Sequence, residues 1–202
     1  MAFSLPRPVI AAALSCVLGA AANAEDRDQL PIKVEARSSD FDYQANVLVF
    51  NEITIVQGGI RIAAQRAVAS GLDFEDSGWE FSGTVSITMP ESSLASESAR
   101  VRFAGGQVQS ATVTGLPATF EQRSATQVTQ GRANRIDYDL GRGTVEFAGD
   151  AWLSDGRNEV SSATLVYSTE TLRVISREQV TFTIKPREPA PQVPTDAPKS
   201  PE

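Results

Sequence analysis

Apolar and polar residues alternate over much of this chain, and the segment RIDYDLGRGTVEF shows the pattern clearly. Before its Gly-Arg-Gly break, Ile136, Tyr138 and Leu140 alternate with charged residues, and after the break Val145 and Phe147 alternate with polar ones. Alternation with a period of two on both sides of a turn is typical of a β-hairpin. The segment therefore predicts a hairpin with one face toward an apolar interior and the other toward water.

Aromatic residues recur along the chain at intervals of 29 to 35 residues. Three of them are followed, across a polar or glycine turn, by a second aromatic residue at Phe50, Phe81 or Phe147. A strand-turn-strand unit that repeats about every 30 residues predicts an all-β fold of stacked units, with about 14 or more short strands. The recurring aromatic residues are Tyr43, Phe74, Phe103, Tyr138 and Tyr167.

The N-terminus has the features of a secretory signal peptide. Arg7 provides a positive charge, an apolar run follows from Val9 to Ala22, and the sequence Ala-Asn-Ala ends at Ala24. Such a run is too short to span a bilayer as a mature helix, so we expect cleavage after residue 24. An uncleaved membrane anchor remains the alternative.

The rest of the chain divides into two parts. Residues 25–185 are expected to form a single domain, whereas six prolines fall within residues 186–202. A proline-rich tail of this kind cannot bury enough apolar surface to order itself, so we expect it to be disordered.

Composition excludes several kinds of chemistry. The chain has no histidine, and Cys16, its only cysteine, lies in the predicted signal peptide. Triads that need histidine or cysteine and ordinary zinc sites therefore cannot form, and no phosphate-binding glycine loop is present. The net charge of −7, without basic clusters, argues against nucleic acid as a partner. We expect no cofactor and no metal.

Pairs of carboxylates are the remaining candidates for catalysis, and two of them serve as examples. Asp137 with Asp139, and Asp40 with Asp42, are each two residues apart, which places their side chains about 6–7 Å apart on one face of a strand. That spacing is compatible with a glycosidase pair. Both pairs lie on the polar face of an amphipathic strand, however, where solvated carboxylates are common. An enzyme acting on polysaccharides is retained as a distant alternative.

The two tryptophans, Trp79 and Trp152, could stack on sugars. A tryptophan in a strand more often belongs to the core, because its large ring is mainly apolar. We therefore predict both as core residues.

The two ends of the predicted sheet should have unpaired edges. Lys33, Glu35 and Arg37 charge the outer face of the first strand but leave its backbone free to pair, and Val180–Ile184 forms the last strand. Free edges suit β-augmentation, in which a partner adds its own strand to the sheet. Shielding of both edges by loops is an equally good alternative.

Three segments resemble the lipopolysaccharide-transport periplasmic protein A family, also called OstA-like. They are PIKVEARSSDFDYQANVLVFNEITIVQGGIRIAAQRAV (31–68), GLPATFEQ (115–122) and the stretch from GRANRIDY to LRVIS (131–176). Two features depart from the family pattern. An additional repeat lies near residues 69–100, and Asn51–Glu52 replaces the usual Thr-Gly turn.

The resemblance implies an open, V-shaped β-jellyroll of two facing antiparallel sheets, whose interior holds the acyl chains of lipopolysaccharide. In the family the opening strand and central aromatic residues line this groove. By position, the corresponding lipid-groove residues are Ile32, Val34, Phe120, Tyr138 and Leu140.

The resemblance also implies a location and partners. The protein would lie in the periplasm of a Gram-negative bacterium. By pairing edge strands, it would join an inner-membrane transporter complex, through a protein C-type component, to an outer-membrane translocon, and copies of it could associate head to tail. A structural β-repeat scaffold that binds no lipid is the alternative function, and it would need only a closed core.

Overall fold

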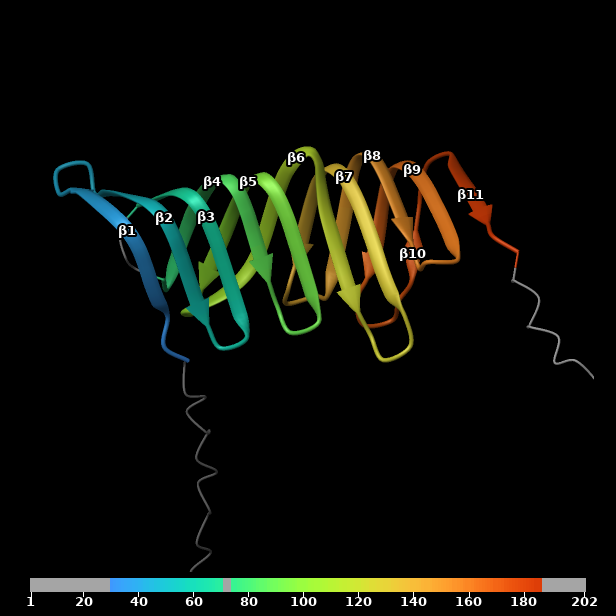
Figure 1. Cartoon of the computed structure of the whole chain (residues 1–202), viewed down its shortest axis with the longest axis horizontal. Coiled ribbons are helices and arrows are strands. Elements are labelled where there is room, and N and C mark those ends of the chain that lie inside the picture. Colours follow the sequence, from blue (N-terminus) through green and yellow to red (C-terminus); the bar gives the residue numbers. More distant parts are fainter. Residues whose placement is uncertain (1–29, 71–73, 187–202) are drawn as a thin grey trace, which may run out of the picture.

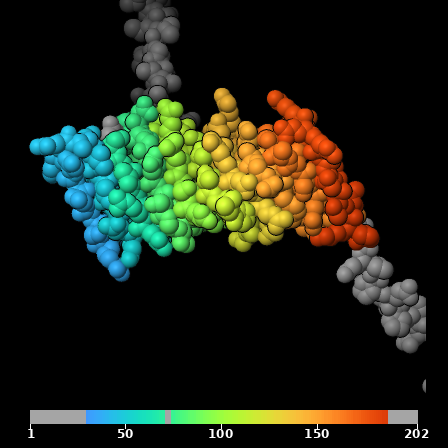
Figure 2. All heavy atoms as spheres, turned by 90° about the horizontal axis from the view of Figure 1, so that it is seen from above, coloured from blue at the N-terminus to red at the C-terminus, as the bar shows by residue number. Residues whose placement is uncertain are grey.

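A computed structural model describes residues 30–70 and 74–186 of the 202 residues. The predicted signal peptide and residues 187–202 of the predicted tail lie outside this range. The described residues form one antiparallel sheet of 11 strands, in which β1 to β10 follow one another in sequence order and β11 pairs with β9. The strands therefore succeed one another along the long axis of the molecule in the order of the sequence (Figures 1 and 2).

The strands alternate in direction, and most neighbours are joined by short turns. Their bounds are β1 (Lys33–Asp42), β2 (Val47–Gln57), β3 (Ile60–Ala69), β4 (Asp76–Thr88), β5 (Ser92–Ala104), β6 (Gln107–Arg123), β7 (Val128–Asp139), β8 (Thr144–Ser154), β9 (Asn158–Ser168), β10 (Val174–Ile175) and β11 (Val180–Ile184).

The single sheet folds over on itself into two facing layers (Figure 1). Between β3 and β9, each pair of successive strands has a break in its register near mid-strand, for example between Ser82 and Val85 in β4 and between Ala148 and Ala151 in β8. We call the strand halves that end at the β1–β2, β3–β4, β5–β6 and β7–β8 turns the first layer. The halves that end at the β2–β3, β4–β5, β6–β7 and β8–β9 turns form the second layer.

Unusual backbone conformations mark the corner between the layers. Gly83 and Gly149 both have φ of +75°, and the residues after them, Thr84 and Asp150, have φ of +49° and +51°. Positive φ bends an extended strand sharply, and glycine adopts it without steric cost. In β2 the corner is formed by Glu52, with φ of +49°, within the Asn-Glu pair that departs from the family pattern.

The core lies between the layers. Period-two burial continues on both sides of the corner, as in β4, where Trp79, Phe81, Val85 and Ile87 are at most 2% exposed. The hairpin predicted around residues 141–143 is confirmed as β7–β8, and its inward residues are buried.

The all-β fold, the antiparallel pairing and the open sheet are confirmed, but residues 30–70 and 74–186 contain 11 strands rather than about 14. The corners explain the difference, because each lies within one continuous strand. The prediction for Trp79 is confirmed and that for Trp152 is wrong. After the corner in β8 the inward positions are Ala151 and Leu153, so Trp152 points outward and is only half-buried.

Candidate functional site: the interior and the two end strands

The N-terminal half of the interior is dominated by aromatic rings of the first layer. The ring centroid of Trp79 lies 5.0 Å from that of Phe74, 5.7 Å from Phe50 and 6.2 Å from both Phe81 and Phe103. Aromatic pairs at these separations stabilise one another beyond the effect of burial alone. This group, which we call the N-terminal aromatic cluster, is covered by the aliphatic side chains of the second layer.

In the C-terminal half, a second aromatic cluster crosses from one layer to the other. Phe120 of the second layer lies 6.1 Å from Tyr138, 5.7 Å from Phe147 and 6.1 Å from Tyr167, which belong to the first layer. Phe147 also packs on the bare backbone of Gly131, where a Cβ atom would lie 2.7 Å from its Cζ. The layers are therefore in direct contact here.

The predicted lipid-groove residues all contact the interior, but the structure divides them into two groups. Phe120 and Tyr138 belong to the second aromatic cluster and are 2% and 9% exposed. Leu140 follows β7 and packs against the core while partly buried. Ile32 and Val34 are also partly buried, at the opposite end of the molecule beside β1.

Hydrogen bonds hold the free rims of the two layers together. In the N-terminal half, Nε2 of Gln57 donates to the carbonyl oxygen of Gly106, at 2.5 Å. In the C-terminal half, Nε2 of Gln122 donates to the carbonyl of Thr169, at 3.1 Å, and its Oε1 accepts from the hydroxyl of Tyr167, at 2.7 Å. Burial raises the pKa of Tyr167, which keeps this hydroxyl a donor. The interior between these rims is thus a packed core.

The interior is accessible at the C-terminal end. A cavity of about 180 Å³ lies there between the layers. This volume is smaller than the roughly 300–1,000 Å³ of typical small-molecule sites, so the cavity is not a complete binding site by itself. Its apolar lining comprises Leu153, Val160, Tyr167, Leu172, Val174 and Phe182.

Strand β11 extends the apolar surface beyond this cavity. Val180, Phe182 and Ile184 alternate along β11 and are 36%, 66% and 69% exposed. Phe182 pairs with the inward-facing Val160, so these three side chains lie on the interior side of the sheet. The free edge of this strand was expected from the sequence, but its apolar face was not, although the alternation with a period of two was visible there.

The strands at both ends have the edges expected from sequence. β1 pairs only with β2, and β11 pairs only with β9, among the described strands. On β1, Lys33 forms an ion pair with Glu35 at 2.6 Å, and Arg37 forms one with Glu52 at 3.0 Å. These exposed pairs contribute little stability but keep the face of β1 polar.

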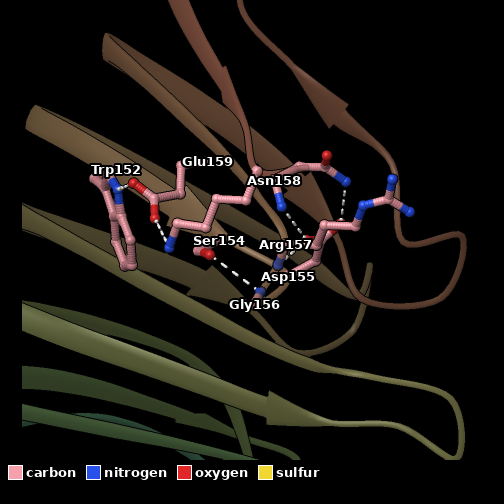
Figure 3. A network of polar contacts seen from close by, with 8 residues as sticks. Trp152, Ser154, Asp155, Gly156, Arg157, Asn158 and Glu159 are labelled. Carbon is pink, nitrogen blue, oxygen red and sulfur yellow. Dashed lines mark hydrogen bonds and ion pairs between the residues drawn. The ribbon is translucent and has the colours of Figure 1, made fainter. Parts of the chain in front are cut away.

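Polar contacts fix the turn that precedes β9 and the end of β11 (Figure 3). The carboxylate of Asp155 accepts hydrogen bonds from the backbone N–H of Arg157, at 2.9 Å, and of Asn158, at 2.6 Å. On the outer face, Glu159 accepts from the indole N–H of Trp152, at 3.4 Å, and pairs with Lys185 at 2.6 Å. The strand that carries the exposed apolar face is therefore held on β9.

The carboxylates of Asp137 and Asp139 have structural partners. Asp137 accepts two hydrogen bonds from Arg135, at 2.7 and 2.8 Å, and one from the hydroxyl of Thr112, at 2.6 Å. Burial raises the pKa of Asp137, but the bonds from Arg135 and Thr112 outweigh this effect and lower it. Asp139 accepts from the backbone N–H of Arg142, at 3.0 Å. A carboxyl with a lowered pKa is poorly suited to act as a general acid.

This ion pair predicts an acid-sensitive contribution to stability. Because the folded pKa of Asp137 lies below the ordinary value of about 3.9, its contribution is present above about pH 4 and is lost as the pH falls through the folded pKa. Asp137→Asn should therefore reduce the free energy of unfolding more at pH 7 than at pH 3. Urea titrations at both values measure this, with Asp40→Asn on exposed β1 as a control for net charge. An equal effect at both pH values would contradict the prediction.

Within residues 30–70 and 74–186, no group of three or more His, Cys, Asp or Glu side chains is arranged to hold a metal ion. The same part of the chain contains no helix with the length and hydropathy needed to cross a membrane.

Comparisons with known proteins identify the family. No curated protein matches the chain. Among solved structures, one match is LptH, described as the LptA homologous periplasmic component of the conserved lipopolysaccharide transport device from Pseudomonas aeruginosa. It has 21% sequence identity and a TM-score of 0.48, over 80% of this chain and 99% of LptH. The family model described as LptA/(LptD N-terminal domain) LPS transport protein matches residues 69–173, just over half of the 202 residues. The chain therefore belongs to the LptA/LptD N-terminal domain family of lipopolysaccharide transport proteins.

Proposed function

We propose that this chain is a non-enzymatic periplasmic carrier that binds the acyl chains of lipopolysaccharide between its two layers and passes the lipid along a bridge of edge-paired partners. One observation carries the proposal. The apolar interior runs the length of the sheet and continues past the last core residues onto the exposed inner face of β11, at Val180, Phe182 and Ile184. Such a face suits an interior that continues into a partner.

Acyl chains can enter only if the layers part, because the described interior is packed. Each hydrogen bond between the rims, such as that from Gln57 to Gly106, contributes about 0.5–1.5 kcal/mol. Relative to water, burial of an acyl chain supplies about 0.8 kcal/mol per CH₂, or roughly 10 kcal/mol for a dozen of them. This exceeds the contribution of a rim bond, and the apolar side chains that separate are covered again by the acyl chain that enters.

The partners follow from the two free edges. An inner-membrane transporter component of the protein C type would pair with one end strand, and an outer-membrane translocon with the other. Backbone pairing supplies the affinity in such contacts. The exposed apolar residues of β11 would be covered in the joined state. The same edges would also allow copies of this chain to associate head to tail.

Photo-crosslinking at two neighbouring positions of β11 tests lipid binding. A photoreactive residue replaces Phe182, which faces the interior, or Thr183, which faces outward, and both positions are exposed. With lipopolysaccharide, we expect adducts at 182 and few at 183. A second pair, Tyr138 and Asp139, reports entry between the layers, since only Tyr138 lies in the interior.

Comparison of each inward position with its outward neighbour distinguishes a lipid carrier from a protein that adsorbs lipid on its surface or binds none. Adducts at 182 and 138 without adducts at their neighbours support the carrier. Equal labelling of both faces would indicate adsorption to the surface, and no labelling at any position would leave the lipid-free scaffold as the better function. In either case the proposal fails.

A further inference from the structure

Two buried polar atoms lack a hydrogen-bond partner within the described part of the chain: Oγ of Ser77 and Nε1 of Trp79. Ser77 is 7% exposed and Trp79 is 0% exposed. A buried donor that stays unpaired costs about 1–3 kcal/mol, so such atoms are uncommon in folded proteins. Both belong to the same face of β4, two residues apart, within the otherwise apolar interior.

In the C-terminal half of the interior, by contrast, the buried hydroxyl of Tyr167 has hydrogen-bond partners. There the hydroxyl of Tyr167 donates to Gln122, at 2.7 Å, and lies 3.4 Å from the hydroxyl of Thr129. The other tryptophan, Trp152, has its indole N–H bonded to Glu159 on the outer face (Figure 3). The two unpaired groups are thus confined to one place, beside the N-terminal aromatic cluster.

Their depth below the rim suggests what they would contact. Ser77 is the second residue of β4, and Trp79 lies about 10 Å from the strand's end at about 3.3 Å per residue. The neighbouring β5–β6 turn supplies Gly106, whose carbonyl accepts the rim bond from Gln57. The unpaired groups therefore lie just inside the rim that must open to admit a lipid.

We propose that Ser77 and Trp79 form a polar subsite in the apolar interior, which donates hydrogen bonds to a hydroxyl or ester oxygen carried near the head group of a bound acyl chain. With the head group outside the rim, such an oxygen enters to the depth of these donors, while the alkyl part continues among the aromatic rings. This inference rests on the proposed function, and it adds that the interior favours lipids with a hydroxyl or ester oxygen near the head group. Plain alkyl chains would leave both donors unpaired.

Nuclear magnetic resonance can observe the proposed donor directly. The chain has two tryptophans, so a ¹⁵N-labelled sample gives two indole N–H signals, which Trp152→Phe assigns. On addition of lipopolysaccharide, we expect the Trp79 signal to move downfield, as a new hydrogen bond requires, and the Trp152 signal to stay in place. An unmoved Trp79 signal with lipopolysaccharide bound overturns the subsite but leaves the carrier function standing.

Two amphiphiles with the same phosphocholine head group test the oxygen requirement. Tetradecanoyl lysophosphatidylcholine carries an ester and a hydroxyl beside its head group, and tetradecylphosphocholine carries neither. Trp79→Phe and Ser77→Ala should each weaken binding of the first about five- to tenfold and leave the second unchanged. Trp152→Phe, the matched control, should affect neither.

Equal weakening of both amphiphiles would show that Trp79 acts only by packing, which contradicts the subsite. If the wild-type protein binds neither lipopolysaccharide nor either amphiphile, the proposed function and the subsite both fail. The two failures are therefore distinguishable.

Discussion

Replacing Phe147 with alanine is expected to lower the free energy of unfolding by about 3–5 kcal/mol, as for other large buried aromatic residues. Phe147 is 0% exposed, and its ring spans the interior to rest on the backbone of Gly131. Because both layers are held by the folded sheet, they cannot collapse freely into the space that the ring leaves. Urea unfolding monitored by circular dichroism measures the loss.

Phe182→Ala provides the matched control, since the same side chain is removed where it is 66% exposed. We expect a change within about 0.5 kcal/mol for this variant. A loss below about 1.5 kcal/mol for Phe147→Ala would mean that the layers do not pack on one another in the C-terminal half. The closed interior described here would then be wrong.

Local sequence pattern was sufficient to predict much of the fold. The β7–β8 hairpin follows from alternation on both sides of a glycine-containing turn, and the structure buries Ile136, Val145 and Phe147 completely. The recurring aromatic residues fall at equivalent places, at or just beyond the strand ends of the first layer, as for Phe103 in β5 and Tyr138 in β7. Period-two alternation records burial directly, which makes these features predictable.

The corners were not predictable in the same way. A glycine followed by a polar residue marks a turn in most strand-turn-strand sequences, but in β4 and β8 the strand bends there and continues. Whether such a position ends a strand or folds a sheet depends on pairing with distant strands. Trp152 was predicted as a core residue from its large apolar ring alone, and after the corner in β8 its side chain points outward.

In the candidate site, too, some features were predictable from sequence and others were not. Phe120 and Tyr138 were expected to line the groove, and the structure places both in the interior. Sequence did not reveal that Gln57 and Gln122 would bridge the rims, because a glutamine near a strand end is usually exposed and its partner here is distant in the chain. The lack of a hydrogen-bond partner for the indole N–H of Trp79 could not be predicted from sequence either, because it depends on how the folded structure packs.

A packed interior and a carrier function are compatible because the fold is open. The sheet does not close into a barrel, since β1 and β11 lie at opposite ends (Figure 1). The strands pass from one layer to the other at the corners, so in the proposed carrier the rims would separate without loss of strand pairing within either layer. In the proposed carrier the corners would act as the hinge, and binding of a lipid or of a partner would open the rims.

Replacing Gly83 with valine is expected to lower the free energy of unfolding by at least about 2 kcal/mol. A non-glycine residue at positive φ costs roughly 1–3 kcal/mol, and a β-branched residue is among the least tolerant. Gly83 has φ of +75°, and a Cβ atom there would also lie 2.9 Å from Cβ of Gln65. Gly149→Val should behave in the same way, since Gly149 has the same φ and would place its Cβ 3.1 Å from Cβ of Asn134.

Gly78→Val in the same strand separates the corner from the general effect of adding a side chain. A Cβ atom at Gly78 meets nothing within 4 Å, and its backbone is ordinary strand, where valine is favoured. We therefore expect no loss of stability for this variant in the same urea titration. If Gly83→Val is as stable as Gly78→Val, the strands do not bend at Gly83. The two-layer arrangement, and with it the interior that lipid would enter, would then need a different corner.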